Sequence, residues 1–429
     1  MKKFILTFLV LFFFFSAFTQ NWYPVGSGVP VVANGIGLFT FNGKLYVGGN
    51  YFSGGYPCAY LYTWNDTTWS NTTFPIGGKG TSAGPMTQYK NNLIVGAWNS
   101  PNNNVEQWND TVWSGIGTGA LAPTTFAVYN GKLYLGSNPG FEVYNDTLWK
   151  TPDSSSIGNV NILATYNGKL YAGGYFQTAS GKPASNIAVW NDTTWMPVGK
   201  GINYYVNALA VYNGKLYAGG EFDSAGGKPA KYLAVWNDTV WAPMNGTINF
   251  IDTIGYGVYN LYVANGNLYV GGFFDSAGGK PAHNVAMWDG TLWHALGTGI
   301  NNGPGSFAWY DSNLYVCGPF DSAGGKPAQN IAIWGTNPLT VNEIKTTNEE
   351  IQVFPNPSNG VFQLITGNEQ VGIKNTAEIY NMLGEKIYQS TLTQANIHID
   401  ISNYSSGIYL YCLVSEKGEL IGSGKLIIQ

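Results

Sequence analysis

The chain has few charged residues, few cysteines and almost no long apolar runs. Charged side chains make up 10% of the 429 residues and the formal net charge is −4, which excludes the basic surface that nucleic-acid binding requires. Three cysteines are too few for a disulfide framework. The one long apolar run lies at the N-terminus, so the rest of the sequence contains no candidate transmembrane segment.

Histidine is equally scarce. His283 falls in a loop, His294 follows a tryptophan and His398 lies near the C-terminus, so each is expected to be a solvated surface side chain. The sequence supplies no convincing pair of imidazoles for copper, no nucleophile elbow and no phosphate-cradling loop. We therefore predict no catalytic residue, no metal site and no cofactor.

Residues 1–19 have the composition of an export signal. Two lysines precede an apolar run from Phe4 to Phe15, and small residues follow it. The run is too short to be a comfortable membrane span, so we expect a signal peptide that is cleaved before Gln20 or Asn21.

Glycine and aromatic residues are abundant, and they belong to a repeat. Tyr-Asn-Gly-Lys-Leu-Tyr or a variant recurs, each time followed by an aromatic-Asn-Asp-Thr-x-Trp segment or a close relative. The copies align on Asn42, Lys90, Asn130, Asn167, Asn213, Asn265 and Asp311. They are about 37 to 52 residues apart, which is the spacing of propeller blades. Asn-Gly favours a tight hairpin turn, so each copy predicts four short antiparallel strands.

The seventh copy lacks its fourth strand. That strand is found at the N-terminus, where Trp22-Tyr23-Pro24-Val25-Gly26 matches the closing segment Trp195-Met196-Pro197-Val198-Gly199 of the fourth copy. We predict an all-β fold in which residues 20–337 form a seven-bladed β-propeller, closed by lending the N-terminal strand to the last blade. An open solenoid is the alternative.

Glycine pairs after the second strand, with the later tryptophan, resemble kelch-like propeller repeats. The pairs are Gly48-Gly49, Gly173-Gly174, Gly219-Gly220 and Gly271-Gly272. The pattern is also similar to the repeats of fungal cortical cell-polarity markers, and it covers most of residues 21–337. The second and third copies depart from it, with Gly96-Ala97 and Gly136-Ser137. Such a resemblance implies an architecture far more than an activity.

Two chemical modifications are left open by the sequence. Cys58 and Cys317 lie in the first and seventh copies, which are neighbours in a closed ring, so either buried free thiols or a bridge would fit. We favour free thiols. Segments such as Asp192-Thr193-Thr194 resemble a bacterial O-glycosylation acceptor pattern, and turn chemistry explains their spacing equally well.

The connections between copies carry the candidate ligand-binding residues. They are Asn203, Tyr204, Tyr205, Asn249, Phe250, Asn301 and Asn302. Amides beside aromatic faces suit stacking on sugar rings, and these connections ring the mouth of a propeller channel. Ordinary turn asparagines and aromatic packing at the rim would explain the same residues.

After a polar linker expected over residues 338–350, residues 351–429 predict about seven short strands and a small Ig-like β-sandwich. The landmarks of this tail are Pro355, Asn356, Pro357, Gly360, Gly384, Gly407, Tyr409 and Lys425. The ordered set resembles the type A C-terminal sorting domain of the type IX secretion system. The resemblance implies a Gram-negative bacterium of the Bacteroidota, passage through the periplasm and across the outer membrane, and the secretion machinery as partner. An appended adhesive sandwich is the alternative.

The sequence therefore predicts a monomeric binding or adhesion module, secreted or held at the cell surface, with an extracellular glycan or protein as ligand. The alternative is an extracellular enzyme that acts on polysaccharide. Two carboxylates about 5 to 10 Å apart in a deep pocket would favour the enzyme, whereas a shallow aromatic face would favour binding.

Overall fold

The protein folds into two compact units, Met1–Asn337 and Pro338–Gln429. The computed structural model describes residues 20–29, 37–53, 56–72, 82–98, 104–152, 156–244, 248–249, 257–335, 352–365, 375–381, 385–391, 396–414 and 420–429. Within these ranges all regular structure is β-strand, and no helix is long and apolar enough to cross a membrane. The expected signal peptide and linker lie outside the described residues.

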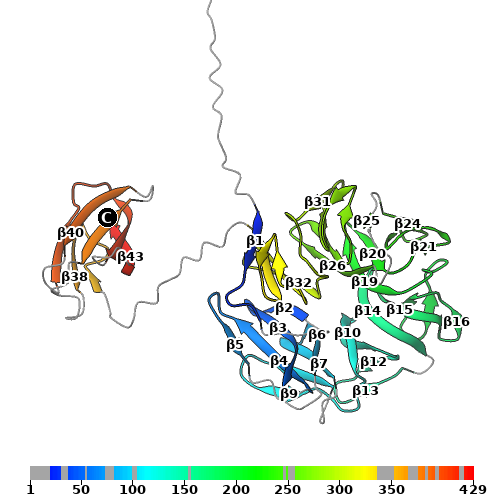
Figure 1. The fold of residues 1–429 in the computed structure, drawn as a ribbon. Coiled ribbons are helices and arrows are strands. Elements are labelled where there is room, and N and C mark those ends of the chain that lie inside the picture. Colours follow the sequence, from blue (N-terminus) through cyan, green and yellow to red (C-terminus); the bar gives the residue numbers. More distant parts are fainter. Residues whose placement is uncertain are drawn as a thin grey trace, which may run out of the picture. The chain divides into compact units, whose positions relative to one another are not determined.

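The first unit is built from antiparallel sheets that share one plan. Its described residues form seven sheets, each with a path of four strands, and Figure 1 shows them arranged around a common centre as in a β-propeller. The strands are β2 (Gly37–Phe41), β3 (Lys44–Ser53), β4 (Tyr56–Trp64) and β5 (Trp69–Asn71) in the first sheet; β6 (Ser82–Tyr89), β7 (Asn92–Trp98), β8 (Val105–Trp108) and β9 (Trp113–Gly115) in the second; β10 (Pro123–Tyr129), β11 (Lys132–Ser137), β12 (Gly140–Tyr144) and β13 (Trp149–Lys150) in the third; β14 (Ile157–Tyr166), β15 (Lys169–Ala179), β17 (Ile187–Trp190) and β18 (Trp195–Pro197) in the fourth; β19 (Val206–Tyr212), β20 (Lys215–Gly220), β23 (Leu233–Trp236) and β24 (Trp241–Pro243) in the fifth; β26 (Val258–Ala264), β27 (Asn267–Gly272), β30 (Val285–Trp288) and β31 (Trp293–Ala295) in the sixth; and β32 (Ser306–Tyr310), β33 (Asn313–Cys317), β36 (Ile331–Gly335) and β1 (Asn21–Pro24) in the seventh. Four short strands per repeat, as predicted, are confirmed.

Short hairpins follow the second strand in the last four sheets. They are formed by β15 with β16 (Lys182–Pro183), β21 (Ser224–Ala225) with β22 (Lys228–Pro229), β28 (Ser276–Ala277) with β29 (Lys280–Pro281), and β34 (Ser322–Ala323) with β35 (Lys326–Pro327). The connections between sheets pair with these hairpins. β25 (Ile248–Asn249) pairs with β28, and Ile202 and Ile300 form bridges with Ala225 and Ala323. Connections and hairpins thus lie side by side.

Tight turns join the first two strands of every sheet in the first unit. Both central residues have positive φ, with 46° at Asn213 and 67° at Gly214. The degenerate second copy keeps this geometry, since φ is 46° at Lys90 and 61° at Asn91. A pair of positive φ values gives the turn whose twist matches that of the flanking strands. The prediction from Asn-Gly is confirmed.

The Asn-Asp-Thr turn joins the third and fourth strands. In the fifth sheet, Asn237 Oδ1 accepts hydrogen bonds from Thr239 N at 3.1 Å, Thr239 Oγ1 at 2.8 Å and Val240 N at 2.8 Å. An asparagine side chain that mimics a backbone turn in this way fixes the loop locally. The threonine hydroxyl of the motif is therefore part of the turn.

The aspartate of this turn reaches back to the preceding sheet. Asp238 has a φ of 70° and accepts from Asn167 Nδ2 at 3.1 Å. Asp110 accepts in the same way from Asn42 Nδ2 at 2.5 Å and from the Tyr46 hydroxyl at 3.2 Å. In these two copies, the second half of the repeat thus links a sheet to the Tyr-Asn-Gly half of the sheet before it.

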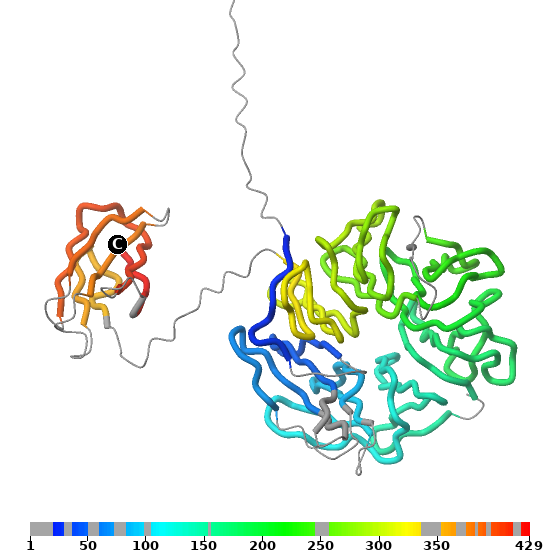
Figure 2. Tube along the Cα trace, viewed as in Figure 1, coloured from blue at the N-terminus to red at the C-terminus, as the bar shows by residue number. Residues whose placement is uncertain are grey.

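The seventh sheet combines both ends of the first unit, because β1 pairs with β36. Trp22 is 1% exposed, and its Nε1 donates to the Leu296 carbonyl in the segment after β31. Trp241 makes the equivalent bond to the Val198 carbonyl after β18. Figure 2 shows the blue N-terminal strand against the yellow last sheet. The predicted pairing of the N-terminal strand with the last repeat is confirmed.

Buried side chains pack between neighbouring sheets. One cluster joins Tyr171 of the fourth sheet to Leu216 and Trp241 of the fifth. Another joins Tyr315 of the seventh sheet to Leu45 of the first. The last and first sheets are thus packed in the same manner as sheets that are consecutive in the chain.

The second unit consists of two antiparallel sheets around one core. Their strands are β37 (Gln352–Phe354), β38 (Val361–Ile365) and β41 (Asn396–Asp400) in one sheet, and β40 (Lys386–Thr391), β39 (Thr376–Tyr380), β42 (Gly407–Val414) and β43 (Leu420–Ile428) in the other. The core includes Phe362 and Ile399 from the first sheet and Ile379 and Leu413 from the second. The described residues of this tail form seven strands, in agreement with the prediction of about seven.

Candidate ligand-binding site

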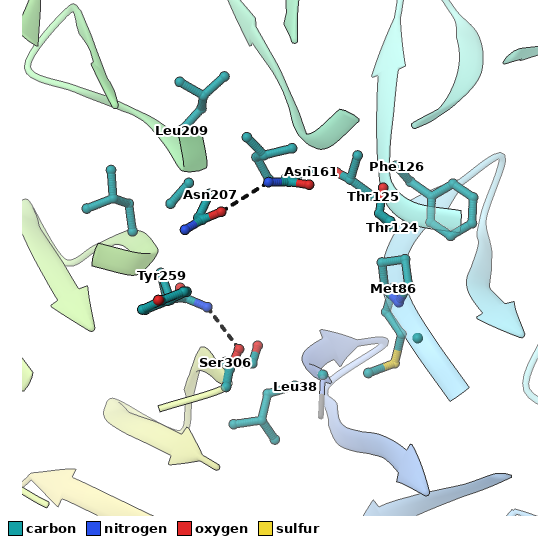
Figure 3. Close-up of a pocket in the computed structure, with 18 residues that line it drawn as sticks. Leu38, Met86, Thr124, Thr125, Phe126, Asn161, Asn207, Leu209, Tyr259 and Ser306 are labelled. Carbon is teal, nitrogen blue, oxygen red and sulfur yellow. Dashed lines mark hydrogen bonds between the residues drawn. The ribbon is translucent and has the colours of Figure 1, made fainter. Parts of the chain in front are cut away.

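The first strands of the seven sheets line a pocket at the centre of the first unit. Its volume is about 370 Å³, and Figure 3 shows the side chains around it. Each sheet contributes to the wall, in order through Leu38, Met86, Phe126, Asn161, Asn207, Tyr259 and Ser306. Since residues from the first to the last sheet surround one space, the pocket is the central channel of the ring.

β-Bulges position the polar side chains of this channel. The pairing of β19 with β20 shifts register between Val206 and Ala208, which leaves Asn207 as an extra residue. The same irregularity leaves Asn161 in β14, Tyr259 in β26 and Thr124 in β10. A bulge redirects the side chain of its extra residue, here one that lines the channel.

These polar side chains form a hydrogen-bonded series from the fourth to the sixth sheet. Asn161 Nδ2 donates to Asn207 Oδ1 at 3.0 Å, and Asn207 Nδ2 donates to Glu221 Oε1 at 3.3 Å. The Tyr259 hydroxyl donates to the same Glu221 oxygen at 3.1 Å. Burial and the Glu221 charge raise the pKa of Tyr259, so its hydroxyl stays protonated at neutral pH. Figure 3 shows Asn161, Asn207 and Tyr259 on one side of the pocket and Met86 on the other.

The lining of the pocket is made of amide, hydroxyl and apolar groups. None of the residues found to line it is an aspartate, glutamate, histidine, cysteine or lysine. Across the described ranges of the chain, no group of three or more His, Cys, Asp or Glu side chains could hold a metal ion. What the channel offers is amide, hydroxyl and apolar surface.

A cluster of tyrosines lies where the connection into the fifth sheet meets β15. The rings of Tyr175 and Tyr205 are stacked, with centroids 4.3 Å apart and planes at 14°. Tyr204 stands edge-on to Tyr205, with centroids 4.7 Å apart. Tyr175 and Tyr204 are 41% and 43% exposed. The cluster is an exposed aromatic surface, formed in part by the predicted residues Tyr204 and Tyr205.

The predicted asparagines are engaged within their loops. Asn203 Oδ1 accepts from the backbone N of Asp223 at 3.2 Å and of Ser224 at 3.0 Å, and its Nδ2 donates to Asp223 Oδ1 at 2.7 Å. Asn301 makes the equivalent contacts with the hairpin of the seventh sheet, where its Nδ2 donates to Asp321 Oδ1 at 2.6 Å. The amides thus hold the hairpin against the connection.

The remaining predicted residues are placed differently. Asn302 Nδ2 donates to the Pro319 carbonyl at 2.9 Å. Asn249 lies in β25, where it pairs with Ser276. Phe250 lies outside the described residues. The structure brings Tyr204 and Tyr205 together and leaves Asn301 and Asn302 two connections further along the ring.

Sequence reasoning missed Tyr175, Glu221, Tyr259 and Phe273. Tyr175, Glu221 and Phe273 each follow directly on a Gly-Gly pair, at a position where the copies differ. That variability within a regular repeat was the available signal. The contact of Tyr175 with Tyr205 joins residues of two sheets, and no local pattern predicts it.

Two histidines of the sixth sheet lie beside aspartates, and Cys317 is buried. His294 Nε2 lies 2.6 Å from Asp289 Oδ2, and His283 Nδ1 lies 3.6 Å from Asp275 Oδ1, with both histidine side chains about half exposed. Cys317 is a free, buried thiol, as expected, and burial raises its pKa. The side chain of Cys58 is not among those described.

Several sorting-motif residues stabilise the second unit. Asn356 Nδ2 donates to the Lys425 carbonyl at 2.6 Å, and Ile427 N donates to Asn356 Oδ1 at 2.9 Å, which attaches the Pro-Asn-Pro segment to β43. The buried Tyr409 donates its hydroxyl to the Ser405 carbonyl at 2.7 Å. Gly360 has a φ of 98°, which favours glycine. Pro355 and Pro357 flank Asn356, Gly407 begins β42, and Gly384 lies outside the described residues.

Residues 352–429 match the family model of the secretion system C-terminal sorting domain. The tail therefore indicates export by the type IX secretion system to the cell surface or the extracellular space. No curated protein matches the chain.

Solved structures similar to the chain have low identity. PorZ, an essential surface component of the type IX secretion system of Porphyromonas gingivalis, shares 13% identity at a TM-score of 0.42, over 94% of this chain and 61% of that one. YCF48 bound to the D1 peptide shares 13% at 0.45, over 75% and 96%. The extracellular domain of a one-component system, BT4673 from B. thetaiotaomicron, shares 12% at 0.49, over 95% and 59%. The chain thus spans about three fifths of the length of PorZ and BT4673.

Proposed function

We propose that the protein is an extracellular binding module, exported by the type IX secretion system, that recognises a glycan on the face where the blade connections lie. The observation that carries the binding role is the exposed tyrosine cluster beside the polar channel. Exposed, contiguous aromatic surface on a soluble protein commonly marks an interaction site. The match of residues 352–429 to the sorting domain supports the extracellular location.

The proposal includes a specific architecture. Residues 1–19 are a cleaved signal peptide, residues 20–337 a seven-bladed kelch-like propeller, residues 338–350 a linker and residues 351–429 an Ig-like sorting domain. Seven four-stranded sheets around one channel support the blade number, and the two-sheet tail supports the sandwich. The source would be a member of the Bacteroidota and the mature protein a monomer.

A binding role agrees better with the channel than polysaccharide hydrolysis does. Hydrolysis by the usual route needs two carboxyl groups flanking the scissile bond. Among the described side chains, Glu221 is the carboxylate bonded to the channel residues Asn207 and Tyr259. The residues found to line the channel include no aspartate or glutamate, so they supply no such pair for the alternative of an extracellular enzyme.

Export can be tested by truncation. Removing residues 351–429 should retain the protein in the periplasm, because the sorting domain is lost and the first unit keeps its own core. Immunoblots of periplasmic, surface and medium fractions, with a periplasmic marker as control, measure this. Normal surface display or secretion of the truncated chain would refute the role of the tail.

Binding can be tested on a glycan array with the chain from residue 20 onward, together with a hydrolysis screen on polysaccharides. We expect retention on a subset of glycans without release of reducing ends. Absence of any binding on a broad array would count against the glycan form of the proposal. Release of reducing ends would favour the enzyme.

A further inference from the structure

Aromatic side chains and one carboxylate form a continuous strip over the fourth, fifth and sixth sheets. We call the following residues the tyrosine–glutamate strip: Tyr175, Tyr204, Tyr205, Glu221, Tyr259 and Phe273. None of them belongs to the buried clusters that hold the sheets together. The copies of the repeat differ at the strip. Its aromatic side chains lie outside the buried clusters, and several of them are exposed.

Glu221 sits at the middle of the strip. Its backbone N donates to the Tyr205 carbonyl at 3.1 Å, which fixes it next to the stacked tyrosines. Its Oε1 atom accepts from Asn207 and Tyr259. In the described part of the chain, no group donates to Oε2. The carboxylate is thus held in position by one oxygen and retains the other as an acceptor.

The far end of the strip repeats the aromatic character. The Phe273 ring stands edge-on to Tyr259, with centroids 5.8 Å apart and planes at 83°, and Phe273 is 37% exposed. Aromatic faces therefore lie on both sides of a carboxylate. Aromatic surface accepts the apolar C–H face of a sugar ring, while an ionised carboxylate accepts hydrogen bonds from adjacent hydroxyls.

We infer that the tyrosine–glutamate strip binds a neutral pyranose chain, with sugar rings against Tyr175, Tyr204 and Phe273 and hydroxyls donating to Glu221. This inference rests on the proposed binding function and assigns the ligand class to one place. A pyranose presents both an apolar face and a rim of hydroxyls, which is the combination that the strip complements. A purely apolar partner would desolvate the Oε2 atom of Glu221 without supplying it a hydrogen-bond donor.

Charge selects neutral over anionic glycans. A uronate or sulfate would meet Glu221, and like charges repel. The sequence contains no arginine at all, so the planar fork that best holds carboxylates and sulfates is missing from every surface of the chain. Of the described ion pairs and cation–π contacts, none places a lysine on the strip.

The test is native electrophoresis of the chain from residue 20 onward in gels that contain a soluble polysaccharide. Neutral gels hold xyloglucan, galactomannan or β-glucan, and anionic gels hold polygalacturonate or alginate. The variants are Tyr204→Ala, which removes an exposed ring, and Glu221→Gln, which keeps an acceptor for Asn207 and Tyr259. The matched control is Tyr404→Ala, a tyrosine of the second unit with 42% exposure against 43% for Tyr204. Near-ultraviolet circular dichroism checks that each variant is folded.

We expect at least one neutral polysaccharide to retard the parent chain and none of the anionic ones to do so. Tyr204→Ala and Glu221→Gln should each raise the dissociation constant by about tenfold, which is the effect of losing one well-placed contact. Tyr404→Ala should leave it unchanged. Equal retardation of all variants would overturn this site and leave the proposed function standing. Retardation only by anionic gels would overturn the ligand class. Binding of neither class, for instance because the strip holds an aromatic peptide, would overturn both this inference and the glycan proposal.

Discussion

At the scale of the residue, the repeat divides into one part that folds each hairpin and one part that joins hairpins. Asparagine closes a turn with its own side chain, as Asn237 does, and the next residue, Asp238, bonds to the sheet before it. The sequence predicted the turns because their chemistry is local. It could not predict the acceptor role of the aspartate, since the partner is about 70 residues away.

One copy of the repeat lacks the aspartate that bonds to the sheet before it. The sixth sheet has Gly290 where the first five sheets have the aspartate, and in the described structure the Tyr212 hydroxyl facing it is buried without a hydrogen-bond partner. A Cβ at Gly290 would lie 3.2 Å from that hydroxyl and 3.3 Å from Asn213 Nδ2. A side chain at residue 290 would therefore lie next to two hydrogen-bond donors, and the glycine there supplies no acceptor for them.

We predict that Gly290→Asp stabilises the protein. The carboxylate would accept from Tyr212 and Asn213, worth about 1 kcal/mol, and aspartates at the sister positions adopt positive φ. Urea denaturation measures the gain. Gly290→Ala, which has a Cβ in a strained conformation and no acceptor, should instead lower the free energy of unfolding. Similar losses for both variants would contradict the missing-bond explanation.

Acid should weaken the links between sheets. The hydrogen bond from Asn42, with the charge of Lys44, lowers the pKa of Asp110 below its usual range. A carboxyl whose folded pKa is lowered contributes stability above its unfolded pKa of about 3.9, and the contribution disappears as pH falls through the folded value. Asp110→Asn should therefore be less stable than the parent at pH 7, and the difference should shrink below about pH 4. Urea titrations at several pH values test this; a constant difference would exclude it.

At the scale of the element, the seventh sheet shows what kind of structural fact a repeat can predict. The missing fourth strand and its displaced copy at Trp22 predicted the pairing of β1 with β36. The bulges at Asn161, Asn207 and Tyr259 could not be found in this way. They depend on how two strands register against each other, which the sequence of one strand does not specify.

We expect Trp22→Ala to be as destabilising as Trp241→Ala. Both side chains are 1% exposed and donate to a carbonyl of the preceding sheet, so each truncation should lower the free energy of unfolding by roughly 3–5 kcal/mol. Val240→Ala, at a site 51% exposed, serves as the control. A much smaller effect at Trp22 in urea denaturation would mean that β1 is only a loose addition to the last sheet.

At the scale of the whole molecule, the tail indicates the destination and the ring provides the surface. The candidate site was predicted in part, since Tyr204 and Tyr205 belong to it. Glu221 directly follows the same β19–β20 hairpin that Tyr205 directly precedes, whereas Tyr175 comes from the fourth sheet, which packs beside the fifth. Sequence spacing locates a loop on a face. Which side chains of other sheets share that face depends on tertiary packing.

The two units should unfold separately. Each has its own core, so Phe362→Ala, at a site with no exposure, should lower one calorimetric transition and leave the other unchanged. The affected transition should lose roughly 3–5 kcal/mol of stability. A shift of both transitions, or a single cooperative transition in the parent chain, would show that the units are coupled.

The pairing of β1 with β36 means that the ring has no intrinsic beginning. The two ends of the first unit meet in one sheet, so a circular permutation that joins them and opens any connection between sheets would keep every strand pair. A chain opened between β31 and β32 would begin with β32, β33, β36 and β1, so the four main strands of the seventh sheet would follow one another in the sequence. The present order, with one strand set apart from the other three, makes completion of that sheet wait for synthesis of the whole ring.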